Sequence, residues 1–137
     1  MNEIFSRSAR LLGEAALETL AQSTVAVFGV GGVGSYACEA LARAGIGSFL
    51  LIDNDVVSPS NLNRQLVALH STIGQQKVAV MRDRILDINP AAQVRTFPLF
   101  YTPETADTVP LAGVDYIVDA IDTVSAKLAL AERAVQL

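Results

Sequence analysis

Four glycines within six residues constrain this chain more than any other feature of its sequence, in the run Gly29-Val30-Gly31-Gly32-Val33-Gly34. The run follows an apolar, β-rich segment at residues 24–28 and precedes a segment of helical periodicity at residues 33–44. In a strand–loop–helix unit, such glycines allow a tight turn, the approach of a phosphate to the backbone and close packing of the helix on the strand. Free N–H groups at the helix start also favour an anion. The run therefore predicts nucleotide binding, with a tight packing turn as the alternative.

The rest of the chain alternates apolar strands with helices, which is the pattern of a parallel sheet covered by helices. The sequence predicts strands at residues 24–28, 49–52, 94–97 and 115–118, helices at residues 7–20, 33–44, 78–88 and 124–135, a short helix at residues 103–107, and a long loop at residues 54–72. The predicted fold class is α/β: a doubly wound, Rossmann-like, mainly parallel sheet with flanking helices, in strand order 3-2-1-4. Residues 1–137 are expected to form a single domain. Because no strand follows the last helix, we expect this domain to be the N-terminal half of a longer fold.

Asp53 follows the second predicted strand, at the carboxyl edge of the sheet where ligands bind in this fold class. An acidic side chain in that place can accept hydrogen bonds from the ribose hydroxyls of a nucleotide. A cap of a helix or turn is the alternative. On this evidence a dinucleotide and ATP remain equal candidates.

The long loop carries Asn61-Leu62-Asn63-Arg64-Gln65, and Lys77 opens the helix that follows it. Both segments come after the strand that ends at Asp53, so they lie at the same edge of the sheet. A pyrophosphate held by N–H groups gains little from two more cations, whereas a triphosphate, with about four negative charges, needs them while phosphorus is attacked. We therefore predict that Arg64 and Lys77 contact a triphosphate. A surface salt bridge for Arg64 and a solvated position for Lys77 are the alternatives.

Two acidic residues follow the fourth predicted strand, in the sequence Asp119-Ala120-Ile121-Asp122. A carboxylate beside phosphate is repulsive unless Mg²⁺ lies between them. We assign Asp122 as the metal ligand and Asp119 as a cap of the turn or helix. Cys38 is expected to be a packed core thiol, and no Ser/His/Asp or Cys/His set points to covalent catalysis.

Composition restricts the setting of the protein. The net charge of −4 provides no basic field for nucleic acid, which is a point against a tRNA partner for these residues. The single cysteine excludes an intrachain disulfide and suits a reducing cytoplasm. No apolar run reaches the roughly 18–20 residues of a membrane span, and the early acid Glu3 is not typical of a signal peptide. We expect a cytoplasmic protein with no membrane partner.

Six motifs together resemble the ThiF/MoeB/HesA family of adenylating enzymes, which includes the ubiquitin-activating enzymes and the activators of the sulfur carriers ThiS and MoaD. They are the glycine run 29–34, Asp53-Asn54-Asp55, Ser60-Asn61-Leu62-Asn63-Arg64-Gln65, Gly74-Gln75-Gln76-Lys77, Asn89-Pro90 and Asp119-Ala120-Ile121-Asp122. The resemblance covers essentially all 137 residues and implies ATP and Mg²⁺ as cofactors. It implies an adenosine and phosphate site lined by Gly29, Gly31, Gly32 and Gly34, ribose at Asp53, triphosphate contacts from Asn61, Arg64 and Lys77, and Mg²⁺ at Asp122. Arg7 would reach the site of the other subunit in a homodimer, although Ile4 replaces the first arginine of the family's pattern.

Within that family, residues 10–14, 34–47 and 119–123 are most similar to the branch of tRNA threonylcarbamoyladenosine dehydratases (TcdA/CsdL). This similarity implies an enzyme that uses ATP to activate the carboxylate of threonylcarbamoyladenosine in tRNA, which then cyclises with loss of water. The alternatives are an adenylyltransferase that activates the C-terminal glycine of a ubiquitin-like sulfur carrier protein, an NAD-binding oxidoreductase, and a non-catalytic nucleotide-binding module. Because family members are longer, we expect residues 1–137 alone to be inactive.

Overall fold

The computed structural model of the protein describes residues 3–137. Four parallel strands form one sheet in the order β3-β2-β1-β4, namely β1 (Thr24–Phe28), β2 (Ser48–Ile52), β3 (Gln93–Phe97) and β4 (Tyr116–Asp119). The α-helices are α1 (Ser6–Leu12), α2 (Glu14–Gln22), α3 (Gly34–Ala44), α4 (Lys77–Ile88) and α5 (Val124–Gln136). Residues 3–137 also form four short 3₁₀ helices, which are η1 (Glu3–Phe5), η2 (Pro59–Asn61), η3 (His70–Thr72) and η4 (Ala106–Thr108). The predicted α/β class and strand order are confirmed.

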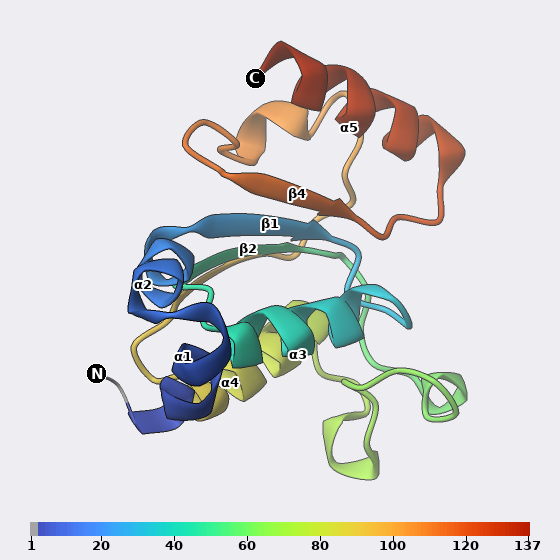
Figure 1. The fold of residues 1–137 in the computed structure, drawn as a ribbon. Helices are drawn as coiled ribbons and strands as arrows, with labels where there is room; N and C mark the ends of the chain where they lie inside the picture. The colour runs from blue at the N-terminus through green and yellow to red at the C-terminus, as the bar shows by residue number, and fades with distance from the viewer. Residues whose placement is uncertain (1–2) are drawn as a thin grey trace.

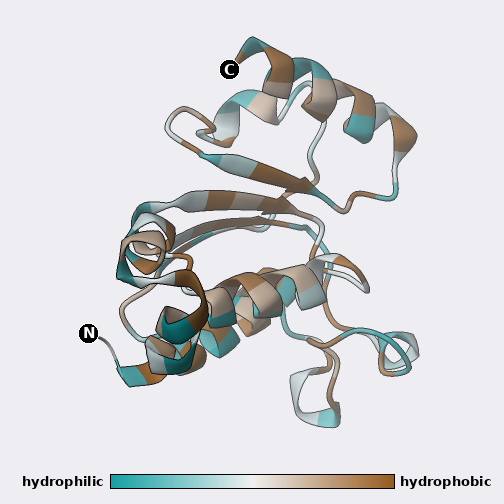
Figure 2. Cartoon of the chain, in the orientation of Figure 1, coloured by the Kyte–Doolittle hydropathy of each residue, from teal (hydrophilic) through white to brown (hydrophobic). Residues whose placement is uncertain are grey.

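Strand β1 lies inside the sheet because its side chains are apolar on both faces. Val25 and Val27 point into one core, Ala26 and Phe28 into the other, and all four are no more than 3% exposed. Helices α3 and α4 cover the first face, while α5 and the segment before β4 cover the second (Figure 1). Figure 2 shows hydrophobic residues concentrated in the strands, between these two layers.

Two predicted helices differ in the structure. The helix predicted at residues 7–20 is divided into α1 and α2 by Gly13, whose φ of 86° and ψ of 158° glycine adopts without steric cost. The helix predicted at residues 103–107 is a turn followed by η4. Thr102 and Thr105 bond to each other's backbone and side-chain atoms there, for example from the Thr102 N–H to Thr105 Oγ1 at 2.8 Å, and such local bonds compete with a helix.

The long loop between β2 and α4 is irregular, as predicted, but its ends are held together. Val56 forms an antiparallel bridge with Gln76, and the Val57 N–H donates to the carbonyl of Gln75 at 2.8 Å. The Lys77 N–H donates to the carbonyl of Asp55 at 3.1 Å. The first residue of α4 is therefore brought back beside the end of β2. Among residues 3–137, no helix is long and apolar enough to cross a membrane.

Candidate functional site

A cavity of about 560 Å³ opens at the carboxyl ends of β1, β2 and β4. This volume lies within the range of about 300–1,000 Å³ that is typical of small-ligand sites. The loops after all four strands line it, together with the loop that contains η2 and the first residue of α4. Of the residues that the sequence analysis assigned to the site, all line this cavity except Gly34 and Arg7.

The glycine run forms the floor of the cavity. Gly29, Gly31 and Gly32 line it, and Gly29 adopts a φ of 91° that favours glycine. Gly34 has a packing role instead, because a Cβ there would lie 1.6 Å from the carbonyl oxygen of Gly29. Gly34 is therefore not among the residues that line the cavity, and its close approach to Gly29 agrees with the predicted role in helix–strand packing.

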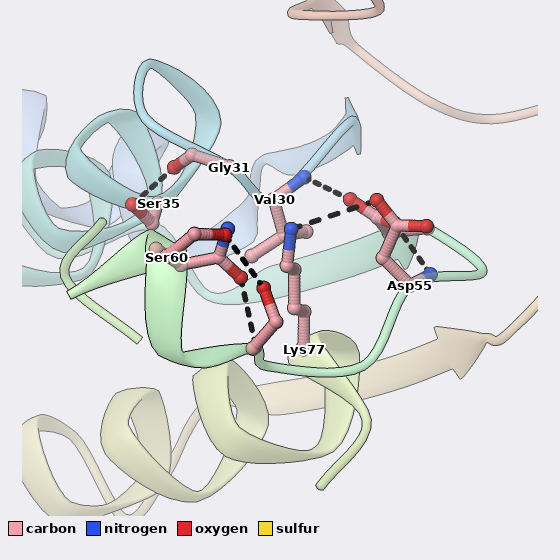
Figure 3. Close-up of polar contacts among 9 residues, drawn as sticks. Val30, Gly31, Ser35, Asp55, Ser60 and Lys77 are labelled. Atoms are coloured by element: carbon pink, nitrogen blue, oxygen red, sulfur yellow. Dashed lines mark hydrogen bonds and ion pairs between the residues drawn. The ribbon is translucent and has the colours of Figure 1, made fainter. Parts of the chain in front are cut away.

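Asp53 ties the end of β2 to the glycine loop. The Val30 N–H donates to Asp53 Oδ2 at 2.7 Å, and the Asp55 N–H donates to Asp53 Oδ1 at 2.8 Å (Figure 3). The turn cap, which the sequence left open as an alternative, is thus present. Each carboxylate oxygen has a second lone pair, so the side chain that lines the cavity can still accept from a ligand.

Arg64 and Asn61 reach the cavity from the loop that contains η2. Asn61 is buried, and its Oδ1 accepts the Ser58 N–H at 2.9 Å, which closes the turn. Arg64 Nη1 donates to the carbonyl of Ser60 at 3.1 Å and to Asn63 Oδ1 at 2.9 Å. Arg64 makes no ion pair with any residue in the range 3–137, so the surface salt bridge considered for it is absent.

Lys77 is buried in the cavity wall, with 5% of the residue exposed. Its Nζ lies 3.5 Å from Oδ2 of Asp55, whose side chain is 64% exposed (Figure 3). A solvated Lys77 is therefore excluded. A buried ammonium with only an exposed carboxylate for a partner is an attractive site for an anion.

The two acidic residues after β4 have different environments. Asp119 Oδ1 accepts the Ile121 N–H at 3.1 Å and pairs with Lys127 Nζ at 3.1 Å, so Asp119 caps the turn as predicted. Asp122 is exposed and lines the cavity, and its carboxylate has no ion pair within the described chain. Residues 3–137 contain no group of three His, Cys, Asp or Glu side chains that would hold a metal ion alone.

One further part of the cavity wall was not predicted. Leu99, Phe100 and Tyr101 line it from the loop after β3, and Phe100 is 46% exposed. The Tyr101 ring packs edge-on against Phe28, with 4.8 Å between the ring centres. Only one signal in the sequence pointed to this wall: the segment follows a predicted strand and so begins at the carboxyl edge.

Residues away from the cavity have structural roles. Cys38 is buried, and burial raises the pKa of its thiol to about 12, so it is a core thiol as predicted. Glu39 Oε2 on α3 forms an ion pair with Arg84 Nη2 on α4, at 2.7 Å. The guanidinium of Arg84 holds the pKa of Glu39 below its ordinary value.

Arg7 lies on α1. Phe5, two residues before it, lies beside Gly45, which follows the end of α3 that is far from the cavity. Arg7 thus does not approach the cavity of its own chain.

Comparison with known proteins agrees with this geometry. A profile of the ThiF family matches residues 5–137. The chain belongs to the ThiF family. Two ThiF-type relatives are tRNA threonylcarbamoyladenosine dehydratases, one from Bacillus subtilis at 54% identity over 126 residues and one from Escherichia coli at 47% identity over 126 residues. Each alignment covers 92% of this chain but only 50% and 47% of the respective relative.

The fold matches a solved structure of the same kind. The crystal structure of E. coli tRNA N6-threonylcarbamoyladenosine dehydratase, TcdA, aligns with a TM-score of 0.94 at 44% identity, covering 98% of this chain and 56% of that one. The E. coli enzyme is also known in complex with ATP and with AMP. This ThiF-family chain therefore spans about half the length of the relatives it matches.

Proposed function

We propose that this protein uses ATP to activate the carboxylate of threonylcarbamoyladenosine in tRNA, giving the cyclic, dehydrated nucleoside. The observation that carries the proposal is the gathering of Arg64, Lys77 and Asp122 around one glycine-lined cavity. The named activity of relatives at 44–54% identity supports the choice of tRNA as the substrate.

The cavity suits a triphosphate because the charged side chains of Arg64, Lys77 and Asp122 line the part of it to which we assign the phosphates. Gly31 and Gly32 allow phosphate to approach the backbone at the start of α3. We assign Arg64 and Lys77 to the β- and γ-phosphates, with Asn61 beside them. Both cations would then stabilise the charge that develops on pyrophosphate as it leaves.

The residues present also fit a magnesium ion. Mg²⁺ is usually held by one or two carboxylates together with substrate phosphates and water, so the absence of a larger acidic cluster in residues 3–137 agrees with this type of site. Asp122 is the carboxylate that we assign to it, because Asp53 caps a turn and Asp55 pairs with Lys77. Bound there, the ion would offset the negative charge of the triphosphate.

The adenosine end would lie across the carboxyl end of β2. Asp53 keeps free lone pairs for the ribose hydroxyls. The wall of Leu99 and Phe100 then faces the base.

The proposed reaction balances without an enzyme thiol. A carboxylate oxygen of the threonylcarbamoyl group attacks the α-phosphorus, and the bond from that phosphorus to the bridging oxygen of the β-phosphate breaks, so pyrophosphate leaves. A nucleophile of the same threonylcarbamoyl group then attacks the activated carbonyl carbon and gives up its proton to solvent, and AMP leaves with the carboxylate oxygen. The water removed from the nucleoside is thus accounted for by conversion of ATP to AMP and pyrophosphate. The raised pKa of Cys38 agrees with a mechanism that does not use this thiol.

We further propose that the full-length protein is a cytoplasmic homodimer. Arg7 is too far from the cavity of its own chain to take part in it, and a partner subunit would be needed to bring an arginine there. The tRNA would contact mainly parts of the protein beyond residues 1–137, since this segment has a net charge of −4.

The test uses the full-length protein with ATP, Mg²⁺ and tRNA that carries threonylcarbamoyladenosine. Mass spectrometry of the digested tRNA should show a nucleoside lighter by one water, together with stoichiometric AMP. Pyrophosphate exchange that depends on a ubiquitin-like sulfur carrier, and not on this tRNA, would instead support the carrier alternative. Tight NADH binding without ATP binding would reject adenylation altogether.

A further inference from the structure

Gln65 is a cavity residue to which the proposed mechanism assigns no role. The residue is 8% exposed and lines the cavity. Its Oε1 is buried and has no hydrogen-bond partner within the described chain. Buried amide groups in folded proteins are nearly always paired, and an unpaired one lowers stability. An unpaired amide in the wall of a ligand site suggests that a ligand completes it.

The position of Gln65 is determined by the glycine loop itself. The buried Ser35 hydroxyl donates to the carbonyl of Gly31 and accepts the Leu66 N–H at 3.3 Å (Figure 3 shows the first of these bonds). The Gln65 N–H also donates to the carbonyl of Asn61 at 2.9 Å. The backbone on both sides of the Gln65 side chain is thus anchored, one side of it directly to the glycine loop.

The side-chain amide lies against the loop at the point where Gly31 lacks a Cβ. A Cβ built on Gly31 would be 3.4 Å from Gln65 Nε2 and 3.8 Å from Gln65 Cδ. Arg64 takes the equivalent place at Gly32, with its Cγ 3.9 Å from a Cβ built there. Two consecutive side chains therefore cover two consecutive glycines, one with a cation and one with a neutral amide.

We propose that Gln65 is a nucleotide-binding residue whose side-chain N–H donates to a phosphate oxygen beside Gly31. This inference rests on the proposed ATP site. Rotation of the carboxamide by half a turn exchanges its donor and acceptor ends, so the amide presents its N–H to an anion whichever end faces the cavity beforehand. This uncharged donor would orient the phosphate, whereas Arg64 and Lys77 would attract it electrostatically.

The experiment compares Gln65→Met, Gln65→Glu and the control Gln22→Met, which changes an exposed glutamine of α2 away from the cavity. Isothermal titration calorimetry measures the affinity of residues 1–137 for ATP. The affinity for adenosine is measured by its competition with ATP. Loss of one hydrogen bond to a charged group should weaken ATP roughly 10- to 100-fold in Gln65→Met. Gln65→Glu, which keeps the shape but places a negative charge beside phosphate, should weaken ATP further. Adenosine affinity should stay within about twofold in every variant, a change of less than half a kcal/mol.

A thermal melt of the ligand-free proteins separates this role from a structural one. Gln65→Met removes an unpaired buried acceptor, so its Tm should equal or exceed that of the parent, opposite in sign to its effect on ATP. A lower Tm with equal losses for ATP and adenosine would make Gln65 a structural residue and overturn the inference, as would unchanged ATP affinity in both Gln65 variants. Failure of the parent chain to bind ATP would instead reject the proposed function on which the inference rests.

Discussion

Lys77 Nζ lies 3.5 Å from Asp55 Oδ2, and the two members of this pair differ sharply in exposure, at 6% for the lysine side chain and 64% for the aspartate side chain. The carboxylate therefore balances a buried positive charge from the solvent side of the cavity. A triphosphate that enters the cavity would be a stronger counterion than this exposed carboxylate, because it carries more negative charge.

Lys77→Met should abolish tight ATP binding while leaving adenosine binding nearly unchanged. The loss of one buried cation facing phosphate is expected to cost about 3–5 kcal/mol, comparable to breaking a buried ion pair. Calorimetric titration of both ligands measures this difference. Lys127→Met is the matched control, since Lys127 pairs with Asp119 and does not line the cavity. Unchanged ATP affinity in Lys77→Met would remove this lysine from the phosphate site.

Arg64→Ala should weaken ATP far more than AMP. Arg64 has no acidic partner in the described chain, so its charge is available to the outer phosphates. We expect a loss of about 1.5–3 kcal/mol for ATP, the value of a hydrogen bond to a charged group. Arg95→Ala, on β3, serves as the control. Equal losses for ATP and AMP would exclude Arg64 from contact with the β- and γ-phosphates.

Asp122→Ala should make ATP binding insensitive to magnesium without altering the fold. The carboxylate makes no ion pair within residues 3–137, so its loss removes nothing that stabilises the free protein. Titrating ATP with Mg²⁺ and then with excess EDTA should give different affinities for the parent and the same affinity for the variant. A variant that retained the full effect of Mg²⁺ would show that the metal is bound elsewhere.

Gly34→Ala should prevent stable folding, whereas Gly32→Ala should be tolerated by the fold. A Cβ on Gly34 would overlap the carbonyl oxygen of Gly29 at 1.6 Å, and the Cβ of Ala120 would lie only 3.4 Å away. At Gly32 the nearest atom is Arg64 Cγ, at 3.9 Å. We expect the first change to destabilise the protein by more than about 4 kcal/mol, as measured by urea denaturation. Equal stability of the two variants would contradict the packing role of Gly34.

Glu39→Gln should lower the stability of the free protein at pH 7, and by a smaller amount at pH 3. The Arg84 guanidinium lowers the pKa of Glu39, so the stabilisation is present above the ordinary carboxyl pKa and is lost as pH falls through the lowered value. Because Arg84 is partly exposed, we expect a difference of about 1 kcal/mol at pH 7. Urea denaturation at the two pH values measures it, with Glu132→Gln on α5 as the control. An equal difference at pH 7 and pH 3 would mean that the Glu39–Arg84 pair is not its cause.

Much of the fold was predictable because its signals are local. Apolar strands such as residues 24–28 alternate with helices of regular periodicity, and this pattern predicts a parallel sheet. The predictions that failed were also local in origin. Gly13 ends one helix and permits another within a single periodic stretch, and the Thr102–Thr105 bonds replace a helix with a turn.

For the site, the sequence by itself determined which residues reach the carboxyl edge of the sheet, because each follows a predicted strand or opens the next helix. Only the tertiary structure decided how they are used there. It assigned Gly34 to packing, joined Asp53 to the Val30 N–H across 23 residues, buried Lys77 beside Asp55, and added Leu99, Phe100 and Tyr101 to the cavity wall. Periodicity shows which face of a helix or strand is buried. Contacts between loops depend instead on how separate strand–helix–strand crossovers are placed relative to one another, and a single sequence carries no local signal for this placement.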